Sequence, residues 1–113
     1  NALVYQAIGG MKFAFIGVND TNSPVDMETV RALIAEAERV ADYVIVHMHW
    51  GEEYQPLSNA RQRRLAHAFI DAGADVIIGN HPHVIQEFEI YQKKPIFYSS
   101  QLFTSFQLFF LFL

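Results

Sequence analysis

Short apolar runs alternate with segments of helical periodicity along this chain. Residues 11–19 (MKFAFIGVN), 43–49 (YVIVHMH) and 75–79 (DVIIG) are rich in β-branched or aromatic residues. Short runs of this type are typical of strands that are buried on both faces of a parallel sheet. The sequence therefore predicts three core strands.

Between these runs, apolar residues recur at the spacing of an amphipathic helix. The predicted helices cover residues 26–40 and 58–72, with Asp26 and Ser58 as N-caps and Gly73 at the end of the second helix. Their apolar stripes consist of Val30, Leu33, Ile34, Ala37 and Val40 in the first helix and Leu65, Ala68, Phe69 and Ala72 in the second.

The last part of the chain predicts a hairpin. Residues 84–91 and 93–100 read as two strands around a turn at Gln92 to Lys94. The resulting order, β-α-β-α-β-β-β, predicts an α/β fold with a mostly parallel sheet, flanking helices and a C-terminal hairpin. We expect residues 1–113 to form one modest domain or a piece of a larger one, that is, a single partial domain, because no linker or internal repeat interrupts the pattern.

Composition narrows the function classes. The chain has 113 residues, 51% hydrophobic and 18% charged, which suits a globular domain. Its net charge is −4 and it has no run of basic residues, which argues against a nucleic-acid partner. Without cysteine it has no disulfide and no thiolate metal site. No signal peptide or membrane anchor is visible in this segment.

The C-terminal segment is atypical. Residues 100–113 (SQLFTSFQLFFLFL) are rich in Phe and Leu, but Thr104, Ser105 and Gln107 interrupt the apolar stretch, which is shorter than the about 17 to 25 residues of a membrane-spanning helix. An edge strand, an interface and an artefact of the sequence are the alternatives for this tail, which would promote aggregation if it were exposed.

Histidines follow two neighbouring predicted strands at the point where each strand ends. His47 and His49 close one strand, and His81 and His83 follow the next within GNHPHV. The carboxyl ends of parallel strands share one edge of a sheet, where ligands bind. Pro82 favours an extended backbone at His81, so that His81 and His83 would point to the same side. We therefore expect these imidazoles to converge on a metal or an anion.

Imidazole nitrogens are suitable ligands for divalent transition metals. The candidate ligands are His49, His81 and His83, and Asp20 could approach them after the first core strand. Residues expected to support these ligands or to contact substrate are His47, Trp50, Glu53, Tyr54 and Asn80. By contrast, His67 is expected to be an ordinary helix residue, and Arg61, Arg63 and Arg64 a solvated helix face.

The stretch from HWGEEY to KKPIFYS resembles the C-terminal half of the CapA-type proteins of bacterial poly-γ-glutamate capsule synthesis, within the calcineurin-like metallophosphoesterase superfamily. The shared features are HWG followed by EY, the segment DAGADVIIGNHPHV, and PIFYS, and the resemblance covers about residues 12–103. In that superfamily a metal-ligating histidine ends a strand, which His49 matches. The last ligand motif is Gly-His-x-His, which Gly79, His81 and His83 match with Asn80 inserted after the glycine.

The resemblance implies part of a calcineurin-like sandwich in which His49 and His81 bind one metal and His83 lies near a second. It implies Mn, Fe or Zn as cofactor, two ions in the full-length protein, and a location at the bacterial cell envelope, membrane-anchored or outside the cytoplasm. The family's upstream ligands (Asp-x-His, Gly-Asp and an Asn-His pair) are absent from this chain, so the chain alone is expected to be inactive.

Two functions remain open at this stage. One is a metal-dependent hydrolase whose substrate is a phosphoester or an amide of a cell-envelope polymer. The other is a non-catalytic component of capsule synthesis or export that binds the polymer or membrane-protein partners with the same fold.

Overall fold

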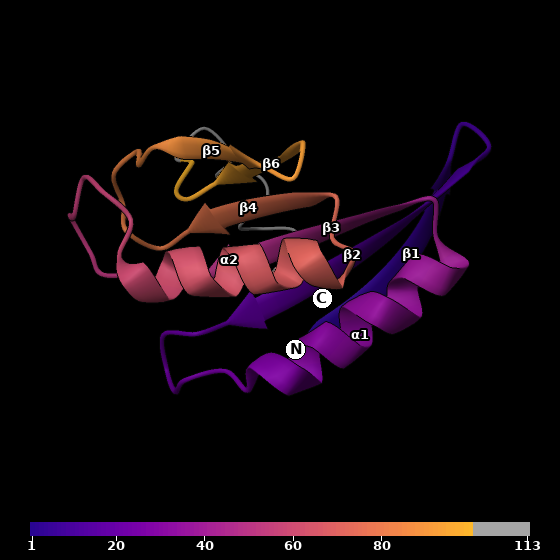
Figure 1. Ribbon diagram of the computed structural model, residues 1–113, viewed down its shortest axis with the longest axis horizontal. Helices are drawn as coiled ribbons and strands as arrows, with labels where there is room; N and C mark the ends of the chain where they lie inside the picture. Colours follow the sequence, from indigo (N-terminus) through magenta and orange to yellow (C-terminus); the bar gives the residue numbers. More distant parts are fainter. Residues whose placement is uncertain (101–113) are drawn as a thin grey trace.

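The computed structural model describes residues 1–100, which form one mixed sheet of six strands with two helices (Figure 1). The strands are β1 (Ala2–Ile8), β2 (Met11–Asn19), β3 (Tyr43–His49), β4 (Val76–Asn80), β5 (Phe88–Tyr91) and β6 (Lys94–Phe97). The helices are α1 (Met27–Val40) and α2 (Ala60–Ala72). Residues 101–113, which hold nearly all of the apolar tail, lie outside the described residues.

The sheet has the order β1-β2-β3-β4-β6-β5. β2, β3, β4 and β6 run parallel, whereas β1 and β5 pair antiparallel at the two edges. The prediction that residues 43–49 and 75–79 form adjacent parallel strands is confirmed, with a register that runs from Ile45 opposite Val76 to His49 opposite Asn80. The predicted C-terminal hairpin is confirmed as β5 and β6, but residues 84–87 precede its first strand.

Strand β1 is not among the predicted elements. It joins β2 through a tight turn in which Gly9 and Gly10 have φ values of 58° and 83°. Two residues with positive φ give a hairpin turn the right-handed twist that its strands need, and glycine adopts such φ values at little cost. The Gly-Gly pair between two apolar runs is therefore the signal in the sequence that indicates this hairpin.

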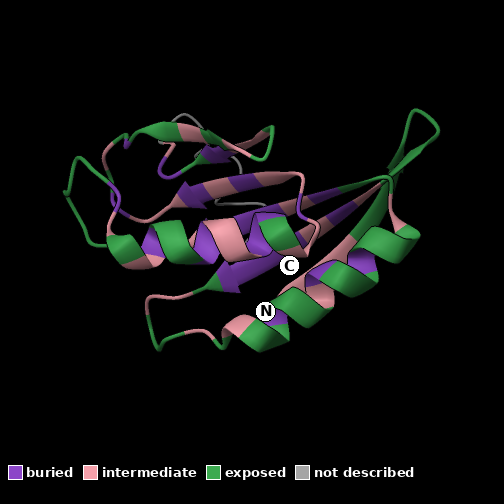
Figure 2. Ribbon diagram, in the orientation of Figure 1, coloured by how far each residue is buried: buried purple, intermediate pink, exposed green. Residues whose placement is uncertain are grey.

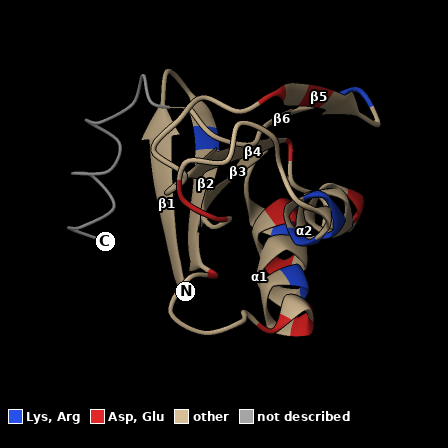
Figure 3. Cartoon of the chain, turned by 90° about the vertical axis from the view of Figure 1, so that its left-hand side faces the viewer, with Lys and Arg blue, Asp and Glu red and all other residues tan. Residues whose placement is uncertain are grey.

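Both helices pack on the same face of the sheet (Figure 3). The core between the helices and the sheet contains one inward-facing residue from each of β2, β3 and β4, together with one residue from each helix. These residues are Ile16, Val46, Ile77, Ile34 and Phe69, and all are fully buried. Buried positions accordingly concentrate in the central strands and on the inner faces of the helices (Figure 2). Because side chains alternate along a strand, His47 and His49 lie on the opposite face from Val46.

The helix ends follow the predictions with one correction. Asp26 caps α1 and accepts from the backbone N–H of Glu28, and Gly73 ends α2 with a φ of 126°. The N-cap of α2 is Asn59 and not Ser58: Asn59 and Gln62 form a reciprocal capping box. Ser58 fails as the cap because its hydroxyl donates to the carboxylate of Glu87.

One residue of the predicted apolar stripe is not buried. Val40, predicted to belong to the buried stripe, is the last residue of α1 and is 49% exposed, because the helix ends there at the rim of the sheet.

None of the helices in the described part of the chain is long and apolar enough to cross a membrane.

Candidate metal centre

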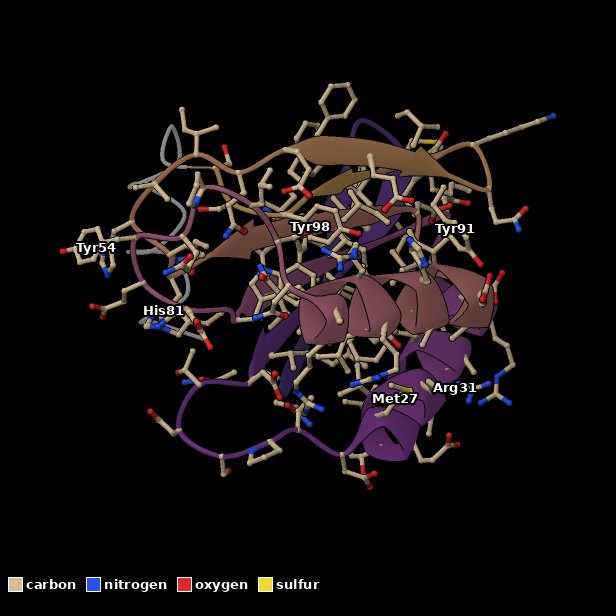
Figure 4. All side chains as sticks on the ribbon, turned by 60° about the vertical axis from the view of Figure 1, so that its left-hand side comes forward. Met27, Arg31, Tyr54, His81, Tyr91 and Tyr98 are labelled. Carbon is tan, nitrogen blue, oxygen red and sulfur yellow. The ribbon has the colours of Figure 1, made fainter. Side chains whose placement is uncertain are left out.

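The carboxyl ends of β3 and β4 and the loops that follow them bring three histidines together. His49 ends β3 opposite Asn80, and its ring centroid lies 4.5 Å from that of His81. The His81 and His83 centroids are 5.8 Å apart. His81 and Tyr54 lie at the same end of the molecule, beyond the strand ends (Figure 4). The expected juxtaposition of His49, His81 and His83 is therefore present in the structure.

One carboxylate joins this cluster. A ligand atom from each of Glu53, His81 and His83 lies within 4.8 Å of the other two. Nε2 of His83 is 3.8 Å from Oε1 of Glu53, too far for a hydrogen bond, and both side chains are about half exposed. Two imidazole nitrogens and a carboxylate oxygen, with a third imidazole beside them, form a donor set that suits Mn, Fe or Zn.

Asn80 orients the ring of His49 and selects its tautomer. The Oδ1 atom of Asn80 lies 2.8 Å from Nδ1 of His49. Because an amide oxygen can only accept, Nδ1 carries the proton, and the lone pair of the neutral ring is on Nε2. Metal-ligating histidines are commonly oriented by such a hydrogen bond to their other nitrogen.

The local environment favours a neutral imidazole at His81. Burial, followed by the nearby His49 ring, lowers the pKa of His81, and Glu53 opposes this effect only in part. A neutral imidazole is the form that can ligate a metal.

The backbone of these loops is strained. Tyr54, His81 and His83 have φ values of 60°, 100° and 62°, in the left-handed region that residues with a Cβ adopt only at a cost. The prediction of an extended backbone at His81 is therefore wrong. The preference imposed by Pro82 is overridden where the chain turns after β4, and the carbonyl of Pro82 there accepts from the N–H of Tyr54 at 2.7 Å. Strained residues of this kind cluster at functional sites.

The remaining candidates differ in position. His47 is 3% exposed, and burial lowers its pKa to about 4, so its ring is neutral at pH 7. Trp50 is fully buried and donates from its indole to the carbonyl of Tyr98 at 2.8 Å, so it lies in the core rather than among the histidines. Tyr54 is 68% exposed, and its ring centroid lies 5.9 Å from that of His83.

Asp20 does not join the cluster. Its carboxylate accepts from Nε and from a terminal nitrogen of Arg61 at 2.8 Å and 2.7 Å, and from the N–H of Val25 at 2.7 Å. The predicted solvated helix face is confirmed for Arg63 and Arg64, which are exposed, whereas Arg61 is partly exposed and is paired with Asp20. Asp20 still supports the site, because its backbone N–H donates to the carbonyl of His49 at 2.8 Å.

His67 is not an isolated helix residue either. Its Nε2 lies 2.9 Å and 3.0 Å from the two carboxylate oxygens of Glu89, and its ring stacks on Tyr91. Sequence reasoning missed this contact, the Asp20–Arg61 pair and a buried glutamine pair, Gln62 and Gln86. Each joins residues far apart in the chain, and no local pattern marks such a partner.

Solved structures define the class of fold. A hypothetical protein from Thermus thermophilus matches with a TM-score of 0.68 at 21% identity, over 86% of this chain and 37% of that one. A putative 5′-nucleotidase from Staphylococcus aureus matches with a TM-score of 0.63 at 18% identity, over 87% of this chain and 23% of that one. This chain therefore shares its α/β fold with part of each of these two proteins.

The family follows from the sequence comparisons. The model of the bacterial capsule synthesis protein PGA_cap matches residues 4–101. The PGA biosynthesis protein CapA of Bacillus subtilis is 42% identical over 108 residues, which are 84% of this chain and 28% of that protein. The capsule biosynthesis protein CapA of Bacillus anthracis is 37% identical over 114 residues, 86% of this chain and 28% of that protein. The chain belongs to this CapA family of capsule synthesis proteins, which associates it with the bacterial cell envelope.

Proposed function

We propose that this chain supplies the histidine end of a metal centre in a hydrolase that acts on a cell-envelope polymer during capsule synthesis. The observation that carries the proposal is the convergence of ligand atoms from Glu53, His81 and His83 within 4.8 Å, beside the ring of His49. The chain spans 28% of the length of its CapA relatives, so the activity, substrate and partners of the whole protein are part of the proposal.

The donor set fits a divalent transition metal, Mn, Fe or Zn, held by His49, His81, His83 and Glu53. When bound, such an ion polarises a phosphoryl or carbonyl oxygen and makes water a better nucleophile. The chain's own residues prepare the site. Asn80 fixes the proton of His49 on Nδ1, and the exposed ring of Tyr54 provides a surface for substrate beside His83. A second ion would need ligands from elsewhere in a longer protein.

The proposed substrate is a phosphoester or an amide of the polymer. Support for the amide comes from the relatives, whose names refer to PGA and capsule biosynthesis. Poly-γ-glutamate is linked by amide bonds, and polarising a carbonyl oxygen is a step that such a metal centre can assist.

One relative favours a second candidate, a non-catalytic role in capsule synthesis or export. A probable polyglutamine synthesis accessory protein of Mycobacterium tuberculosis is 37% identical over 71 residues, 63% of this chain and 19% of that protein. An accessory role needs the fold and its exposed residues to bind polymer or membrane-protein partners, without turnover.

Metal titration tests the proposal. The wild type and His81→Ala are titrated with Mn²⁺ and Zn²⁺ by calorimetry, with His67→Ala as the matched control outside the cluster. We expect His81→Ala to lose binding and His67→Ala to retain it. Equal affinity in all three proteins would refute the metal centre. Hydrolysis of a phosphodiester and of poly-γ-glutamate is measured with the full-length protein and the same two substitutions, because this chain alone is expected to be inactive. The measurement separates the two candidates, since an accessory protein binds without turnover.

A further inference from the structure

The candidate ligands come from two loops that must be held against each other. The first loop, residues 50–59, carries Glu53 and Tyr54, and the second loop, residues 81–87, carries His81 and His83. Both contain residues in the left-handed region. Strained loops keep one geometry only when surrounding contacts determine it.

Hydrogen bonds join the two loops at both ends. Near the histidines, the N–H of Tyr54 donates to the carbonyl of Pro82 at 2.7 Å. Next to α2, the N–H and hydroxyl of Ser58 donate to the carboxylate of Glu87 at 2.8 Å and 2.7 Å. The stretch of the first loop between these links, residues 55–57, is held by a side chain of the second loop.

That side chain is Gln86, which is 5% exposed. Its Nε2 donates to the carbonyl oxygens of Gln55 and Leu57 at 2.8 Å and 3.1 Å, and its Oε1 accepts from Nε2 of Gln62 at 3.0 Å. A carboxamide has two N–H hydrogens and one acceptor oxygen, and all are used here. The buried polar group is fully satisfied, and each of its bonds crosses between segments of the chain.

Gln62 of α2 holds Gln86 in place through the hydrogen bond between their side chains. It is 2% exposed, and its Oε1 accepts from the N–H of Asn59 within the capping box of α2. The first loop packs closely on it, because a Cβ at Gly51 would lie 2.9 Å from the Gln62 amide carbon. The helix, the first loop and the second loop therefore meet at this buried amide pair.

We propose that Gln86 is a positioning residue that holds Glu53 and Tyr54 against His81 and His83, an inference that rests on the proposed metal centre. Its carboxamide is the group that the geometry requires. Glutamate in its place would present oxygens to two carbonyl acceptors, and methionine would fill the space without donating. Loss of the two donated bonds releases residues 55–57, and the carboxylate of Glu53 then leaves the imidazoles.

A metal-independent measurement tests the geometry first. The ring contact between Tyr54 and His83, with centroids 5.9 Å apart, should give a nuclear Overhauser effect in the wild type. It should disappear in Gln86→Met and in Gln86→Glu. Two variants are used because one of them may not fold. Ile34→Val, on the buried face of α1, is the control for a general loss of stability and should keep the signal. Retention of the signal in the folded Gln86 variants would overturn the proposal.

Metal binding tests the consequence. We expect Co²⁺ and Mn²⁺ affinity to fall by about tenfold to a hundredfold in the Gln86 variants, with an altered Co²⁺ absorption spectrum, and to be unchanged in Ile34→Val. Loss of the ring contact with unchanged affinity and spectrum would also overturn the positioning role. If the wild type binds no metal while the Gln86 variants lose the ring contact, the loop geometry stands and the proposed function fails.

Discussion

Residues 1–100 contain two histidine–carboxylate pairs that are built in opposite ways. His67 of α2 and Glu89 of β5 are hydrogen-bonded at 2.9 Å and 3.0 Å, and Glu89 also accepts from the hydroxyl of Tyr98 at 2.7 Å. The His67 ring stacks on Tyr91 with centroids 4.0 Å apart. His67 lies in α2, and Glu89 and Tyr91 lie in β5, so the pair joins the helix to the C-terminal hairpin.

His83 and Glu53 form a looser pair, without a hydrogen bond between their side chains. Its closest atoms are 3.8 Å apart, and its loops contain strained residues. Tyr54 and His81 lie at one end of the molecule and Tyr91 lies toward the other (Figure 4). The same residue types thus serve stability where their bonds are satisfied within the protein. At the second pair, a strained backbone holds an imidazole and a carboxylate near each other at a distance too long for a hydrogen bond between them.

The largest effect is expected at Gly79, which lies between the two regions. A Cβ there would lie 2.2 Å from Nε1 of Trp50 and 2.2 Å from the carbonyl oxygen of Tyr98. Gly79→Ala should therefore break the bond between Trp50 and Tyr98 and lower the free energy of unfolding by more than about 3 kcal/mol. Urea denaturation measures this.

Gly9→Ala is the control for Gly79, because it has open space around it and only a strained φ. It should cost about 1 to 2 kcal/mol. Equal, small losses for both variants would show that the two regions do not depend on a common core contact.

Asp20→Asn should give the next largest effect, because it breaks the ion pair with Arg61 next to the end of β3. Burial raises the pKa of Asp20, but the hydrogen bonds and charge of Arg61 and the N–H of Val25 outweigh it and hold the pKa below its ordinary value. The carboxylate therefore stabilises the fold above about pH 4, and this contribution is lost as the pH falls through the lowered pKa.

At pH 7 we expect Asp20→Asn to lower the free energy of unfolding by about 2 kcal/mol. This is less than for a fully buried pair, because the Arg61 side chain is 39% exposed. The difference from the wild type should narrow as the pH falls below about 4, measured by urea denaturation across pH. A constant difference at all pH values would mean that the ion pair is not its source.

The sequence predicts which strands and histidines lie side by side better than it predicts the backbone conformation of the loops. Strand period, helix period and the handedness of β-α-β crossovers are local or general rules, and they placed β3 beside β4 and so His49 near His81. The backbone of His81 could not be predicted in the same way, because the Tyr54–Pro82 hydrogen bond overrides the local preference. The sequence indicates which side chains approach each other, but not how the chain turns to bring them there.

Long-range partners are the second limit. Asp20 and Arg61 are 41 residues apart, and neither position differs locally from a solvated surface charge. Gln86 falls within the segment 84–91 that the sequence predicts as a strand, and nothing in that segment marks it as a residue that bonds to another loop. Its burial results from the first loop folding over it, which no periodicity of its own segment encodes.

A smaller effect is expected at Asn80, and only on metal binding. Asn80→Ala removes the acceptor that keeps the proton of His49 on Nδ1, so we expect Mn²⁺ and Zn²⁺ affinity to fall about tenfold. Asn80→Asp keeps an acceptor oxygen at this position and should bind at least as tightly as the wild type. Calorimetry on both variants is the measurement. A similar loss in both would point to a steric rather than a hydrogen-bonding role.

The smallest effect is expected at Tyr98, which contacts the hydrogen-bonded pair of His67 and Glu89. Tyr98→Phe removes the hydroxyl that donates to Glu89 but keeps the ring against Trp50 and the carbonyl that the indole needs. Glu89 is 34% exposed, so water can replace the lost donor, and the free energy of unfolding should fall by only about 1 kcal/mol. Metal affinity should not change. A drop in metal affinity comparable to that of Asn80→Ala would show that the two pairs are coupled through Trp50. The pair of His67 and Glu89 would then have a role in the site as well as in stability.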